Sequence, residues 1–233
     1  MDELRRDIGA TTDGPARARL RTELAGLLRA TGELTGALAE LRRAADEGPG
    51  LNIVRLAVLS AARALPPLER TTFLAEIGHI ARTEVPAWSA AIADAQRESG
   101  RPVQAARAWL ALAGDNRFPA HVRRAAARQT LAVAASGLPA EHLAALMLCA
   151  AESTGRARLA FLREALALAP AEGVEYPARL ALASAWIQAG GAFNRIEPLL
   201  AAAEKAGAPY AEEVTRLRRE IERRQPARGG KSN

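Results

Sequence analysis

Apolar side chains recur every three or four residues along most of the chain, and short stretches rich in proline, glycine or charge separate these segments. This recurrence places apolar residues on one face of an α-helix, and no segment shows the alternation of β-branched residues typical of a strand. The pattern predicts helices over residues 15–31, 34–47, 51–64, 67–83, 86–99, 102–114, 119–136, 139–153, 156–169, 177–189, 193–206 and 209–224.

Proline and glycine occur where these helices should begin and end. A proline at the first turn loses no hydrogen bond, and a glycine after the last turn can adopt the left-handed conformation of a C-terminal cap. The predicted starts carry Pro15, Pro86, Pro102, Pro119, Pro139, Pro177 and Pro209, and the predicted ends carry Gly32, Gly100, Gly137 and Gly190. Because the connections are short, we expect neighbouring helices to be antiparallel.

The spacing of the glycines indicates a repeat. Stacked helix–turn–helix units of one common kind have a period of roughly 34 residues. Gly100 follows Gly32 after two such periods, and Gly137 follows Gly100 after slightly more than one. The glycines therefore favour a repeat protein, and an all-α bundle without repeats is the alternative.

The segment Ala18–Leu51 shows the most complete repeat unit. An apolar–small pair and a large apolar residue precede a turn glycine, and small, large and small residues and a proline follow it. These positions are Leu24, Ala25, Leu28, Gly32, Ala37, Leu41, Ala44 and Pro49. This pattern resembles the tetratricopeptide repeat (TPR) family, except that Arg21 stands where the family usually has an aromatic residue.

Parts of the same pattern recur at Pro86–Pro119, around Gly137 and near Gly190, and it is weakest over 52–85 and 156–176. The resemblance covers residues 15–207 and implies a right-handed solenoid of about five to six antiparallel helix pairs. Residues 1–14 are expected to be a polar segment, 208–224 a capping helix and 225–233 a disordered tail. In the capping helix we expect an inner side and a charged outer side. The inner side holds Tyr210, Val214, Leu217 and Ile221, and the outer side holds Glu212, Glu213, Arg216 and Arg219.

Composition supports a helical protein but says less about function. Apolar residues make up 49% of the chain and aromatic residues only 4%, so alanine and leucine must fill the core. The net charge is +6, and nearly all of the basic residues are arginine. This excess suits phosphate or acidic peptides, but a GC-rich codon bias is the favoured explanation because the charge is spread thinly along the chain.

The chain's surroundings are expected to be cytoplasmic. Cys149 is the only cysteine, so an intrachain disulfide is excluded. Met1–Gly14 lacks the apolar segment of a signal peptide, and the uncharged stretch 180–194 is too short and too rich in glycine to span a bilayer.

No catalytic constellation is evident, and no enzyme activity, cofactor or metal is predicted. His142 and Cys149 share one predicted helix face, but further ligands at metal-site spacing are missing. The tail 229–232 resembles the end of a phosphate-binding loop, but position 225 is glutamine rather than the leading glycine, and no strand precedes it.

The resemblance implies a binding surface on the concave side, lined by the first helix of each pair. The residues expected there are Arg19, Arg29, Leu56, Arg63, Asp94, Arg97, Arg124 and Leu131. An arginine in each unit over a small, apolar floor suits a peptide with acidic groups, although these arginines could also serve only solubility.

Three functions follow from this reading. The first is an adaptor or scaffold that binds a protein, peptide or domain. The second is a subunit of a larger or self-associating assembly, which exposed Trp88 or Phe193 would support. The third is a nucleic-acid-binding module, suggested by the cluster Arg117, Arg123, Arg124 and Arg128. It is the least favoured, because only Phe118 lies near this cluster in the sequence.

Overall fold

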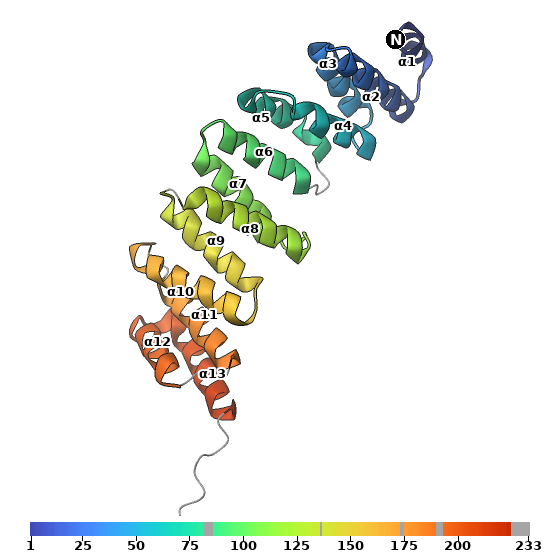
Figure 1. The fold of residues 1–233 in the computed structure, drawn as a ribbon. Helices are drawn as coiled ribbons and strands as arrows, with labels where there is room; N and C mark the ends of the chain where they lie inside the picture. Colours follow the sequence, from blue (N-terminus) through green and yellow to red (C-terminus); the bar gives the residue numbers. More distant parts are fainter. Residues whose placement is uncertain (82–85, 136, 173–174, 190–192, 225–233) are drawn as a thin grey trace, which may run out of the picture. The chain divides into compact units, whose positions relative to one another are not determined.

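The computed structural model describes residues 1–81, 86–135, 137–172, 175–189 and 193–224, and the predicted disordered tail at 225–233 lies outside them. In this described part the regular elements are thirteen α-helices and one 3-10 helix, without a strand (Figure 1). The predicted all-α class is therefore confirmed.

The helices fall into two compact units, Met1–Pro119 and Ala120–Asn233, which we call unit 1 and unit 2. Unit 1 contains α1 (Asp2–Ala10), α2 (Gly14–Ala30), α3 (Leu34–Glu47), α4 (Asn52–Ala62), α5 (Pro67–Glu76), the 3-10 helix η1 (Gly78–Ala81), α6 (Pro86–Glu98) and α7 (Pro102–Gly114). Unit 2 contains α8 (Ala120–Ala134), α9 (Pro139–Ala151), α10 (Gly155–Glu172), α11 (Glu175–Gln188), α12 (Phe193–Lys205) and α13 (Ala208–Arg224).

The local signals at the helix ends act as the sequence predicts. Gly32, Gly100 and Gly137 have φ angles of +85°, +73° and +124°, a region that residues with a Cβ rarely adopt. The Asp13 carboxylate caps α2 by accepting a hydrogen bond of 2.8 Å from the Ala16 backbone N–H. The predicted cap at Gly190 lies outside the described residues.

Two segments differ from the sequence prediction. The polar N-terminal segment contains a helix, α1, which packs on α2 through Leu4 and Ile8. The helix predicted over 67–83 ends at Glu76, and a 3-10 turn begins at Gly78. Glycine is a weak helix former, so a break at this residue has a local cause.

In unit 1 each helix packs on the next, and α2 also packs directly on α4. The residues that define the repeat pattern face inward. Leu24, Ala25, Leu28, Ala37, Leu41 and Ala44 are all buried. The alanines of this set let α2 and α3 approach closely, and the leucines fill the space between the helices.

In unit 2 the helices from α8 to α13 also pack in series, and α11 contacts α13 as well as α12. One core cluster includes Leu162, Leu182, Leu200, Val214 and Leu217. Another cluster holds Leu143, Leu146 and Ala165, with Leu131 packed against it.

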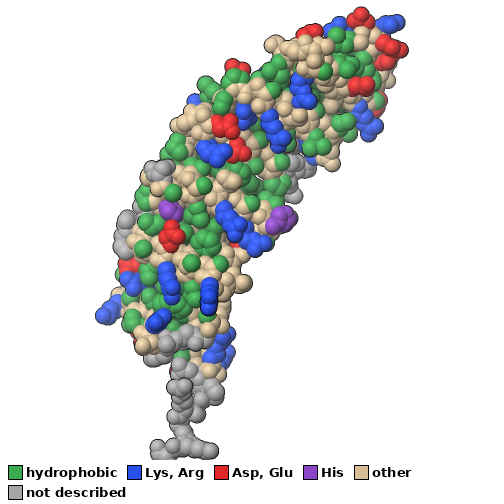
Figure 2. All heavy atoms as spheres, in the orientation of Figure 1, with side chains coloured by type: hydrophobic (Ala, Val, Ile, Leu, Met, Phe, Trp, Pro, Cys, Tyr) green, Lys and Arg blue, Asp and Glu red, His purple; other side chains and the backbone are tan. Residues whose placement is uncertain are grey.

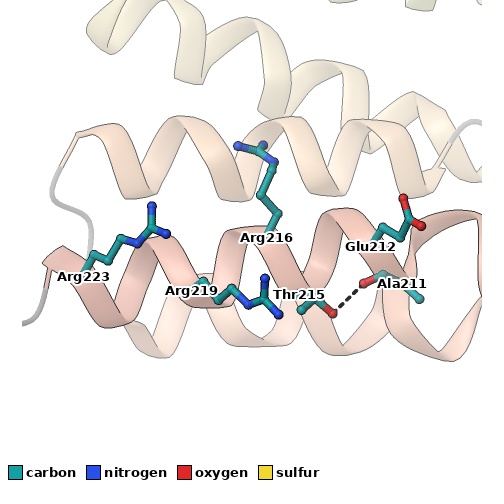
Figure 3. Close-up of a pocket in the computed structure, with 6 residues that line it drawn as sticks. All are labelled: Ala211, Glu212, Thr215, Arg216, Arg219 and Arg223. Carbon is teal, nitrogen blue, oxygen red and sulfur yellow. Dashed lines mark hydrogen bonds between the residues drawn. The ribbon is translucent and has the colours of Figure 1, made fainter.

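The last helix, α13, has the predicted sidedness. Val214, Leu217 and Ile221 are buried, while Arg216 and Arg219 lie on the exposed side. Figure 3 shows Arg216, Arg219 and Arg223 along a shallow hollow of about 450 Å³ on this helix. A charged outer side keeps a terminal helix solvated.

Candidate partner-binding surface

The direct contact between α2 and α4 forms a continuous surface in unit 1. Arg29 on α2 donates a hydrogen bond of 2.7 Å from Nη1 to the Oγ of Ser60 on α4. The residues between the two helices are small, and they surround a hollow of about 40 Å³ lined by Thr22, Ala25, Gly26, Arg29, Leu41, Ala57 and Ala61. Small side chains at this contact allow the two helices to lie side by side.

Two large apolar residues of α4 are exposed on this surface. Ile53 is 52% exposed and Leu56 is 67% exposed. At helical spacing Ile53, Leu56 and Ser60 share one side of α4, and Ser60 is the residue that Arg29 contacts. The exposed apolar pair therefore lies next to α2.

The cations beside this apolar pair are not neutralised by carboxylates. Arg19 and Arg63 are exposed and make no ion pair among the described residues, and Arg29 bonds to the neutral Ser60. Glu23, the one acidic residue of α2, does not pair with Arg19 in the described structure, and α4 contains no acidic residue. We call the set Arg19, Arg29, Ile53, Leu56 and Arg63 the α2–α4 face.

The structure places the eight residues predicted from the sequence in three different settings. Four of them, Arg19, Arg29, Leu56 and Arg63, belong to the α2–α4 face. Asp94 and Arg97 pair with each other on α6 at 3.2 Å, which offsets the charge of Arg97. Arg124 and Leu131 lie on α8, in unit 2.

The two residues on α8 also differ from each other. Arg124 is exposed, whereas Leu131 is half-buried and packs against the cluster of Leu143, Leu146 and Ala165. Leu131 therefore contributes mainly to the core of unit 2. Ile53 was not predicted as a surface residue, although it lies three residues before Leu56 at helical spacing.

Arg21 links α2 to α3 through partly buried ion pairs. Its Nε lies 2.8 Å from Glu47 and its Nη1 lies 2.8 Å from Glu40, and Arg17 also contacts Glu47 at 2.9 Å. Burial alone would lower the pKa of Arg21, but the hydrogen bonds to Glu47 and Glu40 outweigh it and raise this pKa above its ordinary value. Arg21 thus holds α2 and α3 together.

The residues considered for metal binding make other contacts. Cys149 is buried, and His142 lies 3.3 Å from Glu164 of α10. Among the described residues, no group of three or more His, Cys, Asp and Glu side chains is arranged to hold a metal ion. Burial raises the pKa of the Cys149 thiol, and the positive charge of Arg128 opposes this shift only in part.

We expect Cys149 to react slowly in the native protein. The thiol is 3% exposed, and its raised pKa keeps it protonated, while the thiolate is the nucleophile. Reaction with a chromogenic disulfide reagent at neutral pH should be at least about a hundredfold slower in buffer than in denaturant, given an opening free energy of a few kcal/mol. Equal rates in both conditions would contradict this burial.

The two aromatic residues considered for assembly are Trp88 and Phe193. Trp88 is buried in the core of unit 1, and the side chain of Phe193 lies outside the described residues. A separate hollow of about 330 Å³ between α3 and α5 is lined by Leu38, Arg42, Leu65, Leu68, Glu69, Thr72 and Phe73. Leu68 is its exposed apolar residue.

Comparison of the chain with protein-family models, curated proteins and solved structures finds no significant match. Of the helices in the described ranges, none has the length and apolar character needed to cross a membrane. The described helices define an all-α protein in which neighbouring helices pack in series within each unit.

Proposed function

We propose that the chain is a non-catalytic, TPR-like scaffold that binds a partner protein through the α2–α4 face. In this proposal the helix pairs α2–α3, α4–α5 and α6–α7 are successive repeats, and the first helix of each pair faces the partner. The protein would act in the cytoplasm, in keeping with a single cysteine and with no intrachain disulfide.

The observation that carries the proposal is the exposure of Ile53 and Leu56 on α4, together with uncompensated arginines on α2 and at the C-terminal end of α4. Exposed apolar residues that adjoin one another on a surface with a charged border are typical of protein interaction sites. Burying both side chains in an interface would remove their apolar surface from water, at about 25 cal/mol per Å². The arginines favour partners that place carboxylates at the border of this surface.

These features also describe the partner segment. It should carry an apolar residue that covers Leu56, with Asp or Glu residues that can reach Arg19, Arg29 and Arg63. Arginine suits this role because its planar group can form two parallel hydrogen bonds with one carboxylate.

Affinity capture with a charge-reversal variant tests this proposal. The double variant Arg19→Glu and Arg63→Glu should recover its specific partners from a native lysate at least about tenfold less efficiently, which corresponds to about 1.4 kcal/mol. Quantitative mass spectrometry of proteins retained by the immobilised full chain gives the measurement.

The matched control is Arg219→Glu with Arg223→Glu on α13. These two arginines are exposed and have no ion pair in the described structure, so the control changes the net charge by the same amount. It should retain the partners of the unmodified protein. Recovery of the same proteins in the same amounts by both double variants would refute binding at the α2–α4 face.

A further inference from the structure

A second positively charged surface begins on α8, in unit 2. Arg124 and Arg128 are exposed, lie one helical turn apart and have no ion pair among the described residues. The third arginine of α8, Arg123, instead pairs with Glu152, the C-cap residue of α9. Helix α8 contains no acidic residue, so no carboxylate of this helix neutralises Arg124 or Arg128.

Helix α10 adds two more arginines of the same kind. Arg156 and Arg163 are exposed, lie two turns apart on one side of the helix and make no ion pair in the described ranges. The small residue Ala160 lies between them. The guanidinium of Arg163 lies over the ring of Trp186 on α11, 5.6 Å from the ring centre.

The four arginines and the tryptophan belong to one compact unit. Leu131 of α8 and Phe161 of α10 pack against the same core cluster, so α9 holds the two arginine-bearing helices in a fixed arrangement. Figure 2 shows Lys and Arg side chains on one face of unit 2, over α8 and over the region of α10 and α11. We call Arg124, Arg128, Arg156, Arg163 and Trp186 the arginine face.

We propose that the arginine face binds single-stranded nucleic acid. Four uncompensated guanidinium groups can contact successive phosphates, and a base can stack on the planar guanidinium of Arg163, which lies over the half-buried ring of Trp186. The stacked guanidinium of Arg163 keeps its in-plane N–H groups free to donate to phosphate oxygens. An acidic peptide would use the charges alone and would gain little from the aromatic ring.

The combination of these arginines with Trp186 could not be predicted from sequence spacing. Arg124 and Trp186 lie far apart along the chain, and Phe118 is the aromatic residue near the α8 cluster. Packing of α10 on α11 brings Trp186 against Arg163, an arginine outside the sequence cluster of Arg117, Arg123, Arg124 and Arg128. The ion pair between Arg123 of α8 and Glu152 at the end of α9 removes Arg123 from the set.

Fluorescence anisotropy with the full chain tests the proposal. The probes are labelled single-stranded oligouridylate and oligothymidylate of about twelve nucleotides, an order of length that one site of this kind covers. The logarithm of the binding constant, plotted against the logarithm of the salt concentration, should have a slope near −3. Each of the four phosphate contacts on a single strand contributes about −0.7 to this slope.

Two fourfold variants separate a local site from a general charge effect. Replacing Arg124, Arg128, Arg156 and Arg163 by alanine should weaken binding at least about thirtyfold near 0.1 M salt and reduce the slope toward zero. Replacing Arg6, Arg101, Arg219 and Arg223 by alanine removes the same charge from exposed positions outside both proposed surfaces and should weaken binding less than about threefold. Circular dichroism checks that each fourfold variant is folded. The single variants Arg124→Ala and Arg128→Ala should show the same loss of binding to a smaller extent.

The ring of Trp186 has a separate signature. Trp186→Leu keeps an apolar side chain against the core but removes the ring beneath the Arg163 guanidinium, so affinity should fall about fivefold or more while the salt slope stays unchanged. Three results would overturn the proposal. They are no binding of either oligonucleotide at low salt, equal losses in the two fourfold variants, and tighter binding of polyglutamate than of either oligonucleotide.

Discussion

Replacement of Leu41 by alanine is expected to lower the free energy of unfolding by about 3 kcal/mol, within the range of about 2–5 kcal/mol typical of Leu→Ala changes in cores. Leu41 is 2% exposed and lies in the core of unit 1. It also borders the small hollow between α2 and α4, so the lost volume would enlarge an existing space. Partial collapse around the new cavity would recover only part of this loss.

The same substitution at Leu56 provides the matched comparison. Leu56 is 67% exposed, so Leu56→Ala should change the free energy of unfolding by less than about 0.5 kcal/mol. Urea denaturation followed by circular dichroism and tryptophan fluorescence gives both values. Equal destabilisation by the two variants would show that Leu56 is a core residue and would remove the apolar part of the α2–α4 face.

Replacement of Arg21 by alanine is expected to lower the free energy of unfolding by about 2 kcal/mol, because it breaks a partly buried ion-pair network. The change removes one of two arginine partners from each carboxylate, because Glu40 also pairs with Arg43 and Glu47 also pairs with Arg17. Breaking a fully buried pair costs about 3–5 kcal/mol, and partial exposure here reduces that figure.

Arg19→Ala is the matched control for this change, because it removes the same side chain from the same helix. Arg19 is exposed and has no ion pair in the described structure, so its loss should cost less than about 0.5 kcal/mol. Thermal and urea denaturation of both variants provides the comparison. Equal stability of the two would mean that the Arg21 network contributes nothing measurable.

Most of the helices could be predicted because their signals are local. The observed bounds of α3 and α7 match the predicted ranges 34–47 and 102–114. Both helices carry regularly spaced apolar residues and follow a connection that contains a left-handed glycine. The helix α1 was missed because only Leu4 and Ile8 form its apolar side, and the burial that stabilises it depends on α2.

The binding surfaces were less predictable because they depend on which charges are neutralised. The pairing of Asp94 with Arg97 is local, at a spacing of three residues on one helix. The pairing of Arg21 with Glu40 and Glu47, and the contact of Arg163 with Trp186, instead require helices to pack on one another. Sequence spacing alone therefore indicates where arginines occur, whereas packing decides which of them remain available.

Site-specific photocrosslinking tests most directly whether the α2–α4 face binds a partner protein. A photoreactive benzoylphenylalanine in place of Leu56 would lie at the centre of this face, and the same group in place of Arg219 would lie on the exposed side of α13. Our account predicts that irradiation in a native lysate links a defined set of proteins to position 56 and not to position 219. Linkage of the same proteins from both positions, or from position 219 alone, would contradict it.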